Sequence, residues 1–361
     1  MPYLSPTLMQ RLQEHWFYPA KASLKQYERL LLGALEGLYR LVLTLKDSGF
    51  RLKQPGRVNG VSTLAVGNLI VGGAGKTPTV MGLAAWLTKS GRQIGILSRG
   101  YKSQAEHGLC RVLTPNQLNE ITADEVGDEA WLMCWRTGLP VAIGKNRLAS
   151  LETLKSKFPS LDLVILDDGL SQRTLISDRT LLVMDARGFG NRHCLPLGPL
   201  REPAINLTRF DGWVDNGFSE AGLREPLPEH RLQLTQHDTL WVNVDRWQSP
   251  EHWLSLDEGI AQFRQSKILA VAGIAVPERF FESLRRFGLS FEAMPLADHD
   301  PQLVARVLSK CDQSHYDVIL MTEKDAVKFF HHPCAAREKI WALRRQASLE
   351  PSAIERLIHG L

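Results

Sequence analysis

The stretch AVGNLIVGGAGKTPTV, residues 65–80, decides the fold class of this 361-residue chain. An apolar segment runs into a glycine-rich turn, after which Gly75-Lys76-Thr77 opens a helical pattern whose first turn suits Pro78. Glycines allow backbone N–H groups to face a bound anion, and the N-terminus of a helix adds positive potential. The stretch therefore predicts a strand–loop–helix unit that binds a nucleotide phosphate.

The loop departs from the strict phosphate-loop pattern, which has a glycine where this chain has Ile70. Lys76 is expected to reach the outer phosphates and Thr77 to place its hydroxyl on Mg²⁺. An ordinary glycine-rich turn is the alternative, and Gly-Lys-Thr at this junction makes it the weaker one. The predicted nucleotide-binding residues are Ile70, Val71, Gly72, Gly73, Ala74, Gly75, Lys76 and Thr77.

The remainder of the chain alternates apolar runs with helical patterns. Continuous apolar runs suit strands of a parallel sheet that is covered on both faces, so we expect an α/β protein with two lobes and a cleft between them. Strands are predicted within residues 62–70, 93–100, 139–144, 161–169, 180–186, 267–274, 290–296 and 316–325. The predicted domains are a helical segment (1–60), a nucleotide-binding domain (61–212), a linker with extended or antiparallel strands (213–265) and a second α/β lobe (266–361).

The first 60 residues carry nine Lys or Arg and four Asp or Glu, whereas the whole chain has a net charge of only +4. Within them, residues 24–46 repeat apolar side chains at three- or four-residue steps, which predicts an amphipathic helix. Charged residues interrupt it too often for a bilayer-spanning segment. The helix packs either on the protein's own core or in a membrane interface, and the basic flanks favour the membrane.

The five cysteines are scattered without a Cys-x-x-Cys pair, and the N-terminus lacks the pattern of a secretory signal. Both observations predict a protein of the reducing cytosol. Nucleic acid is not expected as a partner, because the basic residues cluster on an apolar helix instead of among stacking aromatic side chains.

Acidic residues at strand and helix ends are candidates for completing the site. Asp167 and Asp168 follow an apolar strand, where a carboxylate can bind Mg²⁺, although Asp-Gly also favours a plain turn. Asp128 and Glu129 open a predicted helix. An N-cap is the favoured role for Asp128 from its position alone, with a catalytic base as the alternative.

Other charged residues occur at the ends of predicted strands or in rigid loops. Arg99, Arg201 and Glu202 are candidates for binding an anion or a sugar, although each alone is more often a surface charge. His299 lies between two aspartates, a setting that can orient a histidine for proton transfer. The segment TEKDAVK, residues 322–328, follows another strand and is either a salt-bridged helix start or part of a site.

Taken in order, several segments resemble the tetraacyldisaccharide 4′-kinase family, the lipid A 4′-kinases. They are VGNLIVGGAGKTP, LSRGY, VGDEA, DDGL, FGN…LPLGPLREP, ADHD and TEKDAVK, and they run from residue 66 to residue 328. The resemblance implies two P-loop-like α/β lobes with mainly parallel sheets and an ATP- and Mg²⁺-dependent kinase. Its substrate would be the 4′-hydroxyl of a tetraacylated glucosamine disaccharide 1-phosphate, a lipid A precursor. The implied place is the cytoplasmic face of the inner membrane.

The resemblance also implies roles for particular residues. Asp128 becomes a catalytic carboxylate paired with His299, which replaces the N-cap interpretation, and Lys76 joins them as a catalytic residue. Asp167 and Asp168 become the acids on the Mg²⁺ side. The chain departs from the family's pattern at Gln172 and Asp300, where histidines are usual. Arg99, Glu129, Arg201 and Glu202 remain possible substrate-binding residues.

Other functions fit parts of the sequence. A membrane-associated P-loop ATPase switch without a lipid acceptor would explain the loop and the amphipathic helix. A kinase-like chain that has lost activity would explain Gln172. A GTPase is disfavoured, because the chain lacks an Asn-Lys-x-Asp segment for reading guanine.

Overall fold

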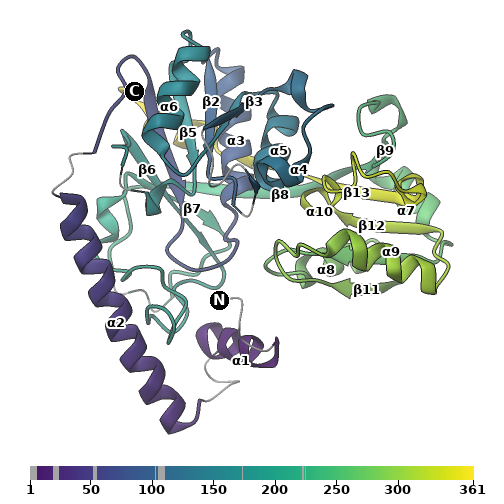
Figure 1. Ribbon diagram of the computed structural model, residues 1–361, viewed down its shortest axis with the longest axis horizontal. Helices are drawn as coiled ribbons and strands as arrows, with labels where there is room; N and C mark the ends of the chain where they lie inside the picture. Colours follow the sequence, from purple (N-terminus) through teal and green to yellow (C-terminus); the bar gives the residue numbers. More distant parts are fainter. Residues whose placement is uncertain are drawn as a thin grey trace. The chain divides into compact units, whose positions relative to one another are not determined.

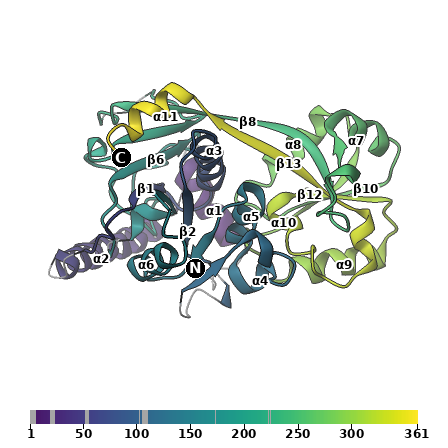
Figure 2. The same cartoon turned by 90° about the horizontal axis from the view of Figure 1, so that it is seen from above.

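The computed structural model describes residues 6–18, 24–51, 55–101, 103–104, 110–172, 174–221, 223 and 225–361. The chain is a mixed α/β protein in which most strand pairs are parallel, as predicted (Figures 1 and 2). It divides into two compact units. The first unit comprises Met1–Thr79, Ile165–Leu234 and Leu349–Leu361, and the second comprises Val80–Val164 and Thr235–Ser348.

The sheet of the first unit has the strand order β8-β7-β6-β1-β5. Its β1–β6, β6–β7 and β7–β8 pairs are parallel. The strands are β1 (Ser62–Gly67), β5 (Leu163–Asp167), β6 (Arg179–Asp185), β7 (Gly212–Asn216) and β8 (His230–Asn243). Every residue of β5 and most of β1 are buried, which explains why these strands read as unbroken apolar runs.

Helix α3 (Lys76–Lys89) begins directly after the glycine-rich loop, so the loop joins the carboxyl end of β1 to the N-terminus of a helix. A hydrophobic cluster supports the neighbourhood of this loop. It is formed mainly by Leu69, Ile70, Leu182, Met184, Phe189, Leu200, Leu207 and Trp213. The C-terminal helix α11 (Pro351–Ile358) also belongs to this unit.

In the second unit, strands β2 (Ile94–Ser98) and β4 (Val141–Ile143) pair in parallel, and β3 (Arg111–Leu113) lies antiparallel to β4. Helices α4 (Ala123–Val126) and α5 (Asp128–Thr137) lie between β3 and β4 in the sequence, and α6 (Arg147–Lys157) follows β4. Helix α5 is the predicted helix of the VGDEA segment.

The remaining strands of the second unit have the order β11-β10-β12-β13-β8. Its strands β10 (Ile268–Ala272), β11 (Phe291–Pro295), β12 (Val318–Thr322) and β13 (Ile340–Leu349) pair in parallel, and β9 (Leu254–Ser255) lies antiparallel to β8. Helices α7 (Leu256–Phe263), α8 (Glu278–Arg286), α9 (Leu303–Gln313) and α10 (Glu323–Ala326) complete it. Trp241, Phe263, Phe281, Leu284 and Leu320 form the centre of its core.

Among the described residues before β1, helix α1 spans Pro6–Phe17 and helix α2 spans Gln26–Arg51, the second drawn as a long purple helix in Figure 1. The large apolar side chains of α2 are 43% to 70% exposed; they are Tyr27, Leu30, Leu31, Leu35, Leu38, Leu41, Val42 and Leu45. The alternative that this stripe packs on the protein's own core is therefore wrong. No helix in the described ranges is long and apolar enough to cross a membrane.

The opposite face of α2 docks on the first unit. Glu36 is buried and accepts hydrogen bonds from the His193 ring at 2.9 Å and from the backbone N–H of Cys194 at 2.8 Å. The Tyr39 hydroxyl donates to the carbonyl of Arg201 at 2.8 Å. Helix α2 is therefore fixed to the loop that carries Arg201 while its apolar stripe faces outward.

Candidate active site

The conformation of the glycine-rich loop in the first unit is fixed by side-chain hydrogen bonds to its backbone. The Asn68 side-chain amide donates to the carbonyls of Ile70 at 2.8 Å and Gly72 at 3.3 Å. Gly75 has φ +101°, a conformation that L side chains rarely adopt, and a Cβ there would lie 2.5 Å from the amide nitrogen of Asn216. Glycine is thus required at this position both by backbone geometry and by space.

Ile70 shows why the strict phosphate-loop pattern fails here. Its side chain is only 3% exposed and belongs to the hydrophobic cluster under the loop. Its backbone forms an isolated antiparallel bridge with Leu200, and the next residue, Val71, donates its N–H to the carbonyl of Pro199 at 2.9 Å. The first part of the loop is therefore anchored as core structure, and the segment from Gly72 onward is the part suited to surround an anion.

Lys76 lies among polar groups at the start of α3. Its Nζ is 3.0 Å from Oδ1 of Asn68 and 3.7 Å from Oδ1 of Asp168. Asp168 also accepts two hydrogen bonds of 2.9 Å from the Arg201 guanidinium. The structure thus brings together Lys76, Asp168 and Arg201, three of the residues singled out in the sequence. It adds Asn68, which the sequence analysis missed although it lies within the quoted motif.

The predicted Mg²⁺ ligands are Thr77, Asp167 and Asp168. Thr77 is the second residue of α3, and Asp167 is the last residue of β5 with only 4% exposure. All three offer hard oxygen donors, the type that Mg²⁺ takes together with phosphate and water oxygens, so the donor set fits this ion. Within the described part of the chain, no group of three or more His, Cys, Asp or Glu side chains is arranged to hold a metal.

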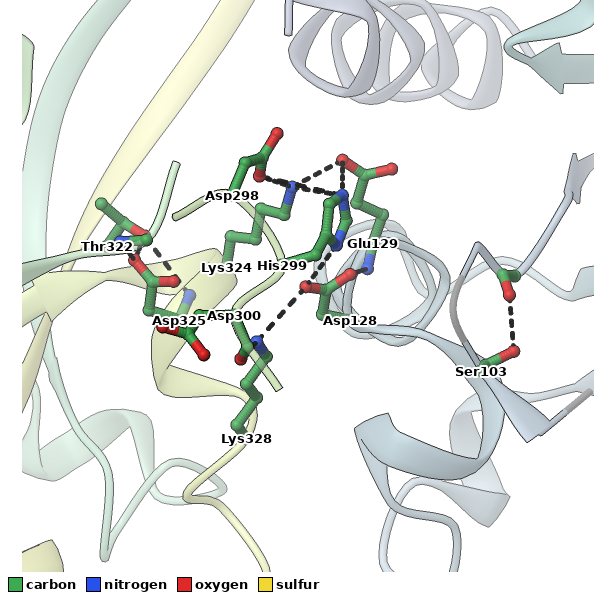
Figure 3. Close-up of polar contacts among 12 residues, drawn as sticks. Ser103, Asp128, Glu129, Asp298, His299, Asp300, Thr322, Lys324, Asp325 and Lys328 are labelled. Carbon is green, nitrogen blue, oxygen red and sulfur yellow. Dashed lines mark hydrogen bonds and ion pairs between the residues drawn. The ribbon is translucent and has the colours of Figure 1, made fainter. Parts of the chain in front are cut away.

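The second unit contains a cluster of charged side chains around His299, which we call the His299 cluster: Asp128, Glu129, Asp298, His299, Lys324 and Lys328 (Figure 3). Nδ1 of His299 is 3.0 Å from Oδ2 of Asp128, and its Nε2 is 3.0 Å from Nζ of Lys324. The His299 side chain is 14% exposed and that of Asp128 is 7% exposed. Asp128 and His299, 171 residues apart in sequence, thus lie in direct contact.

Asp128 is not the N-cap of α5. Gly127 occupies that position with φ +96°, and Asp128 is the first helical residue. The N-cap interpretation is therefore wrong, although Oδ1 of Asp128 still accepts a first-turn hydrogen bond from the N–H of Glu129 at 2.8 Å. Burial opposes ionisation of Asp128, but the His299 hydrogen bond and the charges of Lys324 and Lys328 lower the pKa of the carboxyl below its usual value.

The loop that carries His299 is held by Asp300. His299 has φ +55°, an uncommon value for a residue with a side chain. Asp300 is buried, and its carboxylate accepts a hydrogen bond of 2.8 Å from the N–H of Gln302. Its backbone carbonyl accepts a hydrogen bond of 3.2 Å from the Lys328 ammonium. At the position where the family resemblance leads us to expect a second histidine, this chain has a carboxylate that stabilises the turn before α9.

Gln172, the other departure from the family's pattern, also has a structural role. Its side-chain oxygen accepts hydrogen bonds from the N–H groups of Thr174 at 3.1 Å and Leu175 at 3.0 Å, and its amide donates to the Leu175 carbonyl at 2.8 Å. Gln172 therefore closes the turn that follows the Asp167-Asp168 pair.

The remaining predicted residues are Arg99, Glu202 and Glu129. Arg99 is exposed just beyond the end of β2. Glu202 pairs with Arg209 at 2.6 Å. Glu129, by contrast, belongs to the His299 cluster, where its carboxylate forms an ion pair of 2.9 Å with the Lys324 ammonium. Tyr101 was not predicted, and its ring lies edge-on to the His299 ring with centroids 5.4 Å apart.

Lys324 and Lys328, from the TEKDAVK segment that the sequence leaves open between a salt-bridged helix start and a site, both belong to the His299 cluster. Lys324 contacts Glu129 and Asp298 at 2.9 Å each. Burial alone would lower the pKa of Lys324, but Glu129, Asp298 and Asp128 raise its pKa well above the ordinary value, so the amine remains an ammonium. The TEKDAVK segment is thus both a helix start and part of the cluster.

A glycine-rich loop that ends in Lys-Thr, between a parallel strand and a helix, defines an α/β protein of the P-loop type. The family model described as tetraacyldisaccharide-1-P 4′-kinase (LpxK) matches residues 28–361. The chain belongs to this family of kinases.

Similar proteins cover almost the whole chain. The tetraacyldisaccharide 4′-kinase of Dechloromonas aromatica is 36% identical over 97% of both chains. The tetraacyldisaccharide 4′-kinase of Methylibium petroleiphilum is 38% identical over 82% of this chain and 79% of its own length. The crystal structure of LpxK from Aquifex aeolicus, described as an "apo" form in complex with ATP, shares the fold, with a TM-score of 0.70. It is 24% identical and covers 91% of this chain and 99% of its own.

Proposed function

We propose that this protein transfers the γ-phosphoryl group of ATP to the 4′-hydroxyl of a tetraacylated glucosamine disaccharide 1-phosphate, a step of lipid A biosynthesis. The observation that carries this proposal is the family match over residues 28–361 in a chain that keeps both the Lys76 loop and the Asp128–His299 pair. The relatives are named for this acceptor. A P-loop ATPase switch without a lipid acceptor is not favoured.

The glycine-rich loop is the proposed ATP site. The Aquifex aeolicus protein of the same fold forms a complex with ATP. In this chain the backbone N–H groups from Gly72 to Thr77 would surround the phosphates and Lys76 would bind the outer ones. This requires Lys76 to exchange its present contacts with Asn68 and Asp168 for phosphate oxygens.

The side chains of Thr77, Asp167 and Asp168 would hold Mg²⁺. The ion, when bound, supplies charge neutralisation on the phosphate oxygens. Arg201 already neutralises Asp168 through two hydrogen bonds, and in the proposed reaction it is free to bind phosphate once Asp168 has another positive partner. Arg99, Glu129 and Glu202 are the remaining candidates for holding the sugar and its phosphate.

Asp128 is the proposed proton acceptor. As the 4′-oxygen forms its bond to the γ-phosphorus and the bond to ADP breaks, the hydroxyl proton moves to the Asp128 carboxylate. The lowered pKa of Asp128 keeps it ionised at neutral pH, which is the state that can accept a proton. His299 holds the carboxylate in place through Oδ2.

The exposed stripe of α2 is the proposed membrane contact. It presents eight large apolar side chains from Tyr27 to Leu45, and the basic residues Arg29 and Arg40 on the same helix are exposed. Such a helix lies in the headgroup region, attracted by anionic lipids. This contact would bring the enzyme to a lipid substrate at the cytoplasmic face of the inner membrane, with no transmembrane helix needed.

The decisive assay mixes the protein with γ-³²P-labelled ATP and the disaccharide lipid and separates the products by thin-layer chromatography. The proposal predicts labelled lipid with wild-type protein and almost none with Lys76→Ala or Asp128→Ala. Free labelled phosphate without labelled lipid would favour an ATPase switch and overturn the proposal. Neither labelled product from folded wild-type protein would identify a chain that has lost activity.

A further inference from the structure

Lys324 is a cation in direct contact with the His299 ring. Its Nζ is 3.0 Å from Nε2 of His299 and 2.9 Å from both Glu129 and Asp298 (Figure 3). The Lys324 side chain is 16% exposed. The proposed phosphoryl transfer assigns this lysine no task, so the reason for a buried ammonium against a histidine nitrogen needs an explanation.

The chemistry of the two groups fixes the position of the ring proton. An ammonium has three donors and no acceptor, so Nε2 of His299 must accept a hydrogen bond from Lys324. A neutral imidazole carries one proton, and with Nε2 as the acceptor that proton is on Nδ1. Nδ1 faces Oδ2 of Asp128 at 3.0 Å, so the N–H donates to the carboxylate.

The turn that carries Lys324 is firmly held. The Thr322 hydroxyl accepts the N–H of Asp325 at 3.3 Å as the N-cap of α10, and the buried Asp325 carboxylate accepts the N–H of Gly273 at 2.9 Å. A Cβ at Gly273 would lie 2.8 Å from Asp325, so the approach of these two segments also depends on glycine. The backbone at Lys324 therefore has little freedom to move away from the histidine.

The preceding residue, Glu323, ties the same turn to the helix of Asp128. The Glu323 carboxylate is 7% exposed and forms ion pairs with Arg136 of α5 and, at 2.9 Å, with Arg344 of β13. Arg136 lies on the helix that begins with Asp128. Breaking the ion pairs of a buried carboxylate is costly in free energy. The Glu323 ion pairs therefore fix the distance between α5 and α10, and so the distance between Asp128 and Lys324.

From these contacts we propose that Lys324 is a positioning residue that holds His299 neutral, with its proton on Nδ1, so that Asp128 acts as the proton acceptor. This inference rests on the proposed kinase function. The lysine does not touch the reacting atoms; it acts through the ring. An imidazolium in this place would bind the Asp128 carboxylate more strongly and weaken it as a base.

The charges around the ring show what removal of Lys324 would do. Carboxylates of Asp128, Glu129 and Asp298 lie 3.0 to 3.8 Å from the ring nitrogens, and Lys328 is 3.9 Å from Oδ2 of Asp128. The Tyr101 ring lies edge-on to the His299 ring. Removal of Lys324 would take away the donor that faces Nε2 and leave these three carboxylates beside the ring, an arrangement that favours a proton on Nε2.

The direct test is ¹⁵N NMR of the histidine rings in the full-length, ligand-free protein, with His299→Asn to assign the signals. The proposal predicts a wild-type His299 ring at neutral pH with a protonated Nδ1 and an unprotonated Nε2. In Lys324→Met the signal should become that of an imidazolium or of the other tautomer, whereas Lys328→Met should leave it unchanged. A wild-type ring protonated on Nε2, or the same signal in Lys324→Met, would overturn the inference.

Kinetics provide a second, independent readout. Lys324→Met should lower kcat by about ten- to a hundredfold with little change in KM for ATP, and should move the acidic limb of the pH–rate profile to higher pH. Lys324→Arg keeps the charge and should recover part of the rate. An unchanged pH profile in folded Lys324→Met would contradict the positioning role. If wild-type protein phosphorylates no lipid, the proposed function fails while the NMR result still decides the tautomer.

Discussion

The glycine-rich loop and the His299 cluster are built from different kinds of charged and polar groups. The loop is one continuous stretch in the first unit, and its predicted ligand contacts are mostly backbone N–H groups plus Lys76. The His299 cluster belongs to the second unit and consists of side chains from three distant segments, around residues 128, 299 and 324. The first site depends on local backbone conformation and the second on tertiary packing.

This difference determines which kind of substitution should disturb each site. In the loop, a change of conformation at a single glycine disturbs several donors at once, because all of them lie on the same turn. In the cluster, the loss of one side chain leaves buried polar groups without their partner, since Asp128 and Lys324 both contact the His299 ring. Mutations in the two sites should therefore separate nucleotide binding from proton transfer.

The largest expected effect is on the cluster side of the comparison. Asp128→Asn keeps the shape of the side chain but removes the proton acceptor, so kcat should fall about a hundred- to ten-thousandfold. The measurement is steady-state phosphorylation of the disaccharide lipid, with circular dichroism as the folding control. If kcat stays within a fewfold of wild type, Asp128 is not the base.

A substitution in the loop should act through the backbone. Gly75→Ala forces a side chain into φ +101° and towards Asn216, so it should cost about 1–3 kcal/mol in strain and weaken ATP binding by about tenfold or more. Gly91→Ala is the matched control, because Gly91 has φ +86° but open space around its Cβ position. Equal ATP affinities for the two variants, measured by titration calorimetry, would show that the tight approach at Gly75 has no bearing on nucleotide binding.

The pH dependence sharpens the account of the cluster. Burial would raise the pKa of Asp128, but its hydrogen bond to His299 contributes to lowering that pKa below the ordinary value. The stabilisation from ionised Asp128 is therefore present above the unfolded-state pKa and is lost as the pH falls through the lowered folded value. His299→Asn should raise the Asp128 pKa, so chemical denaturation of this variant between about pH 3 and pH 6 should show acid destabilisation beginning at higher pH. Superimposable pH–stability curves for variant and wild type would contradict this.

Outside both sites, the apolar stripe of α2 should determine membrane binding. Leu31→Glu or Leu38→Glu should reduce partitioning to vesicles of anionic and zwitterionic lipid by about tenfold, because burying a leucine contributes roughly 1.5–3 kcal/mol. Gln26→Glu changes the charge equally but lies off the stripe, and it should have a much smaller effect. Vesicle sedimentation measures the difference; equal losses for all three variants would point to charge alone.

The smallest effect is expected where α2 meets the Arg201 loop. Tyr39→Phe removes the hydrogen bond from the hydroxyl to the Arg201 carbonyl, which contributes about 1 kcal/mol. The catalytic efficiency should fall by about fivefold, with the loss in KM for the lipid if Arg201 binds its phosphate. An unchanged kcat/KM would show that this contact fixes α2 without affecting Arg201.

The sequence was most informative where structure is local. The loop, the strands around it and the helix from Lys76 are as predicted, because glycine spacing and unbroken apolar runs report directly on turns and buried parallel strands. Strand β13 was not predicted, since its partly exposed residues include Arg344 and Arg345, which break the apolar run. Asn68 was missed because its contact with Lys76 depends on how the loop folds back.

The His299 cluster was predictable only in part, and through the family resemblance. Nothing in residues 128–129 alone indicates that His299 lies beside them, because the two segments meet only in the folded second unit. Position in the sequence favoured Asp128 as an N-cap, yet Gly127 takes that place. The task of Lys324 emerges only once its distances to Nε2 of His299 and to two carboxylates are known.

In the proposed function, the loop binds ATP and the cluster accepts the proton, and one paired measurement tests this division of roles directly. ATP dissociation constants and single-turnover rates of lipid phosphorylation should be determined for Lys76→Ala and Asp128→Asn. We expect Lys76→Ala to lose ATP affinity as well as rate, and Asp128→Asn to bind ATP as wild type does while its rate falls at least about a hundredfold. A loss of ATP affinity in Asp128→Asn as large as that in Lys76→Ala, or a near-normal rate in Asp128→Asn, would contradict the division.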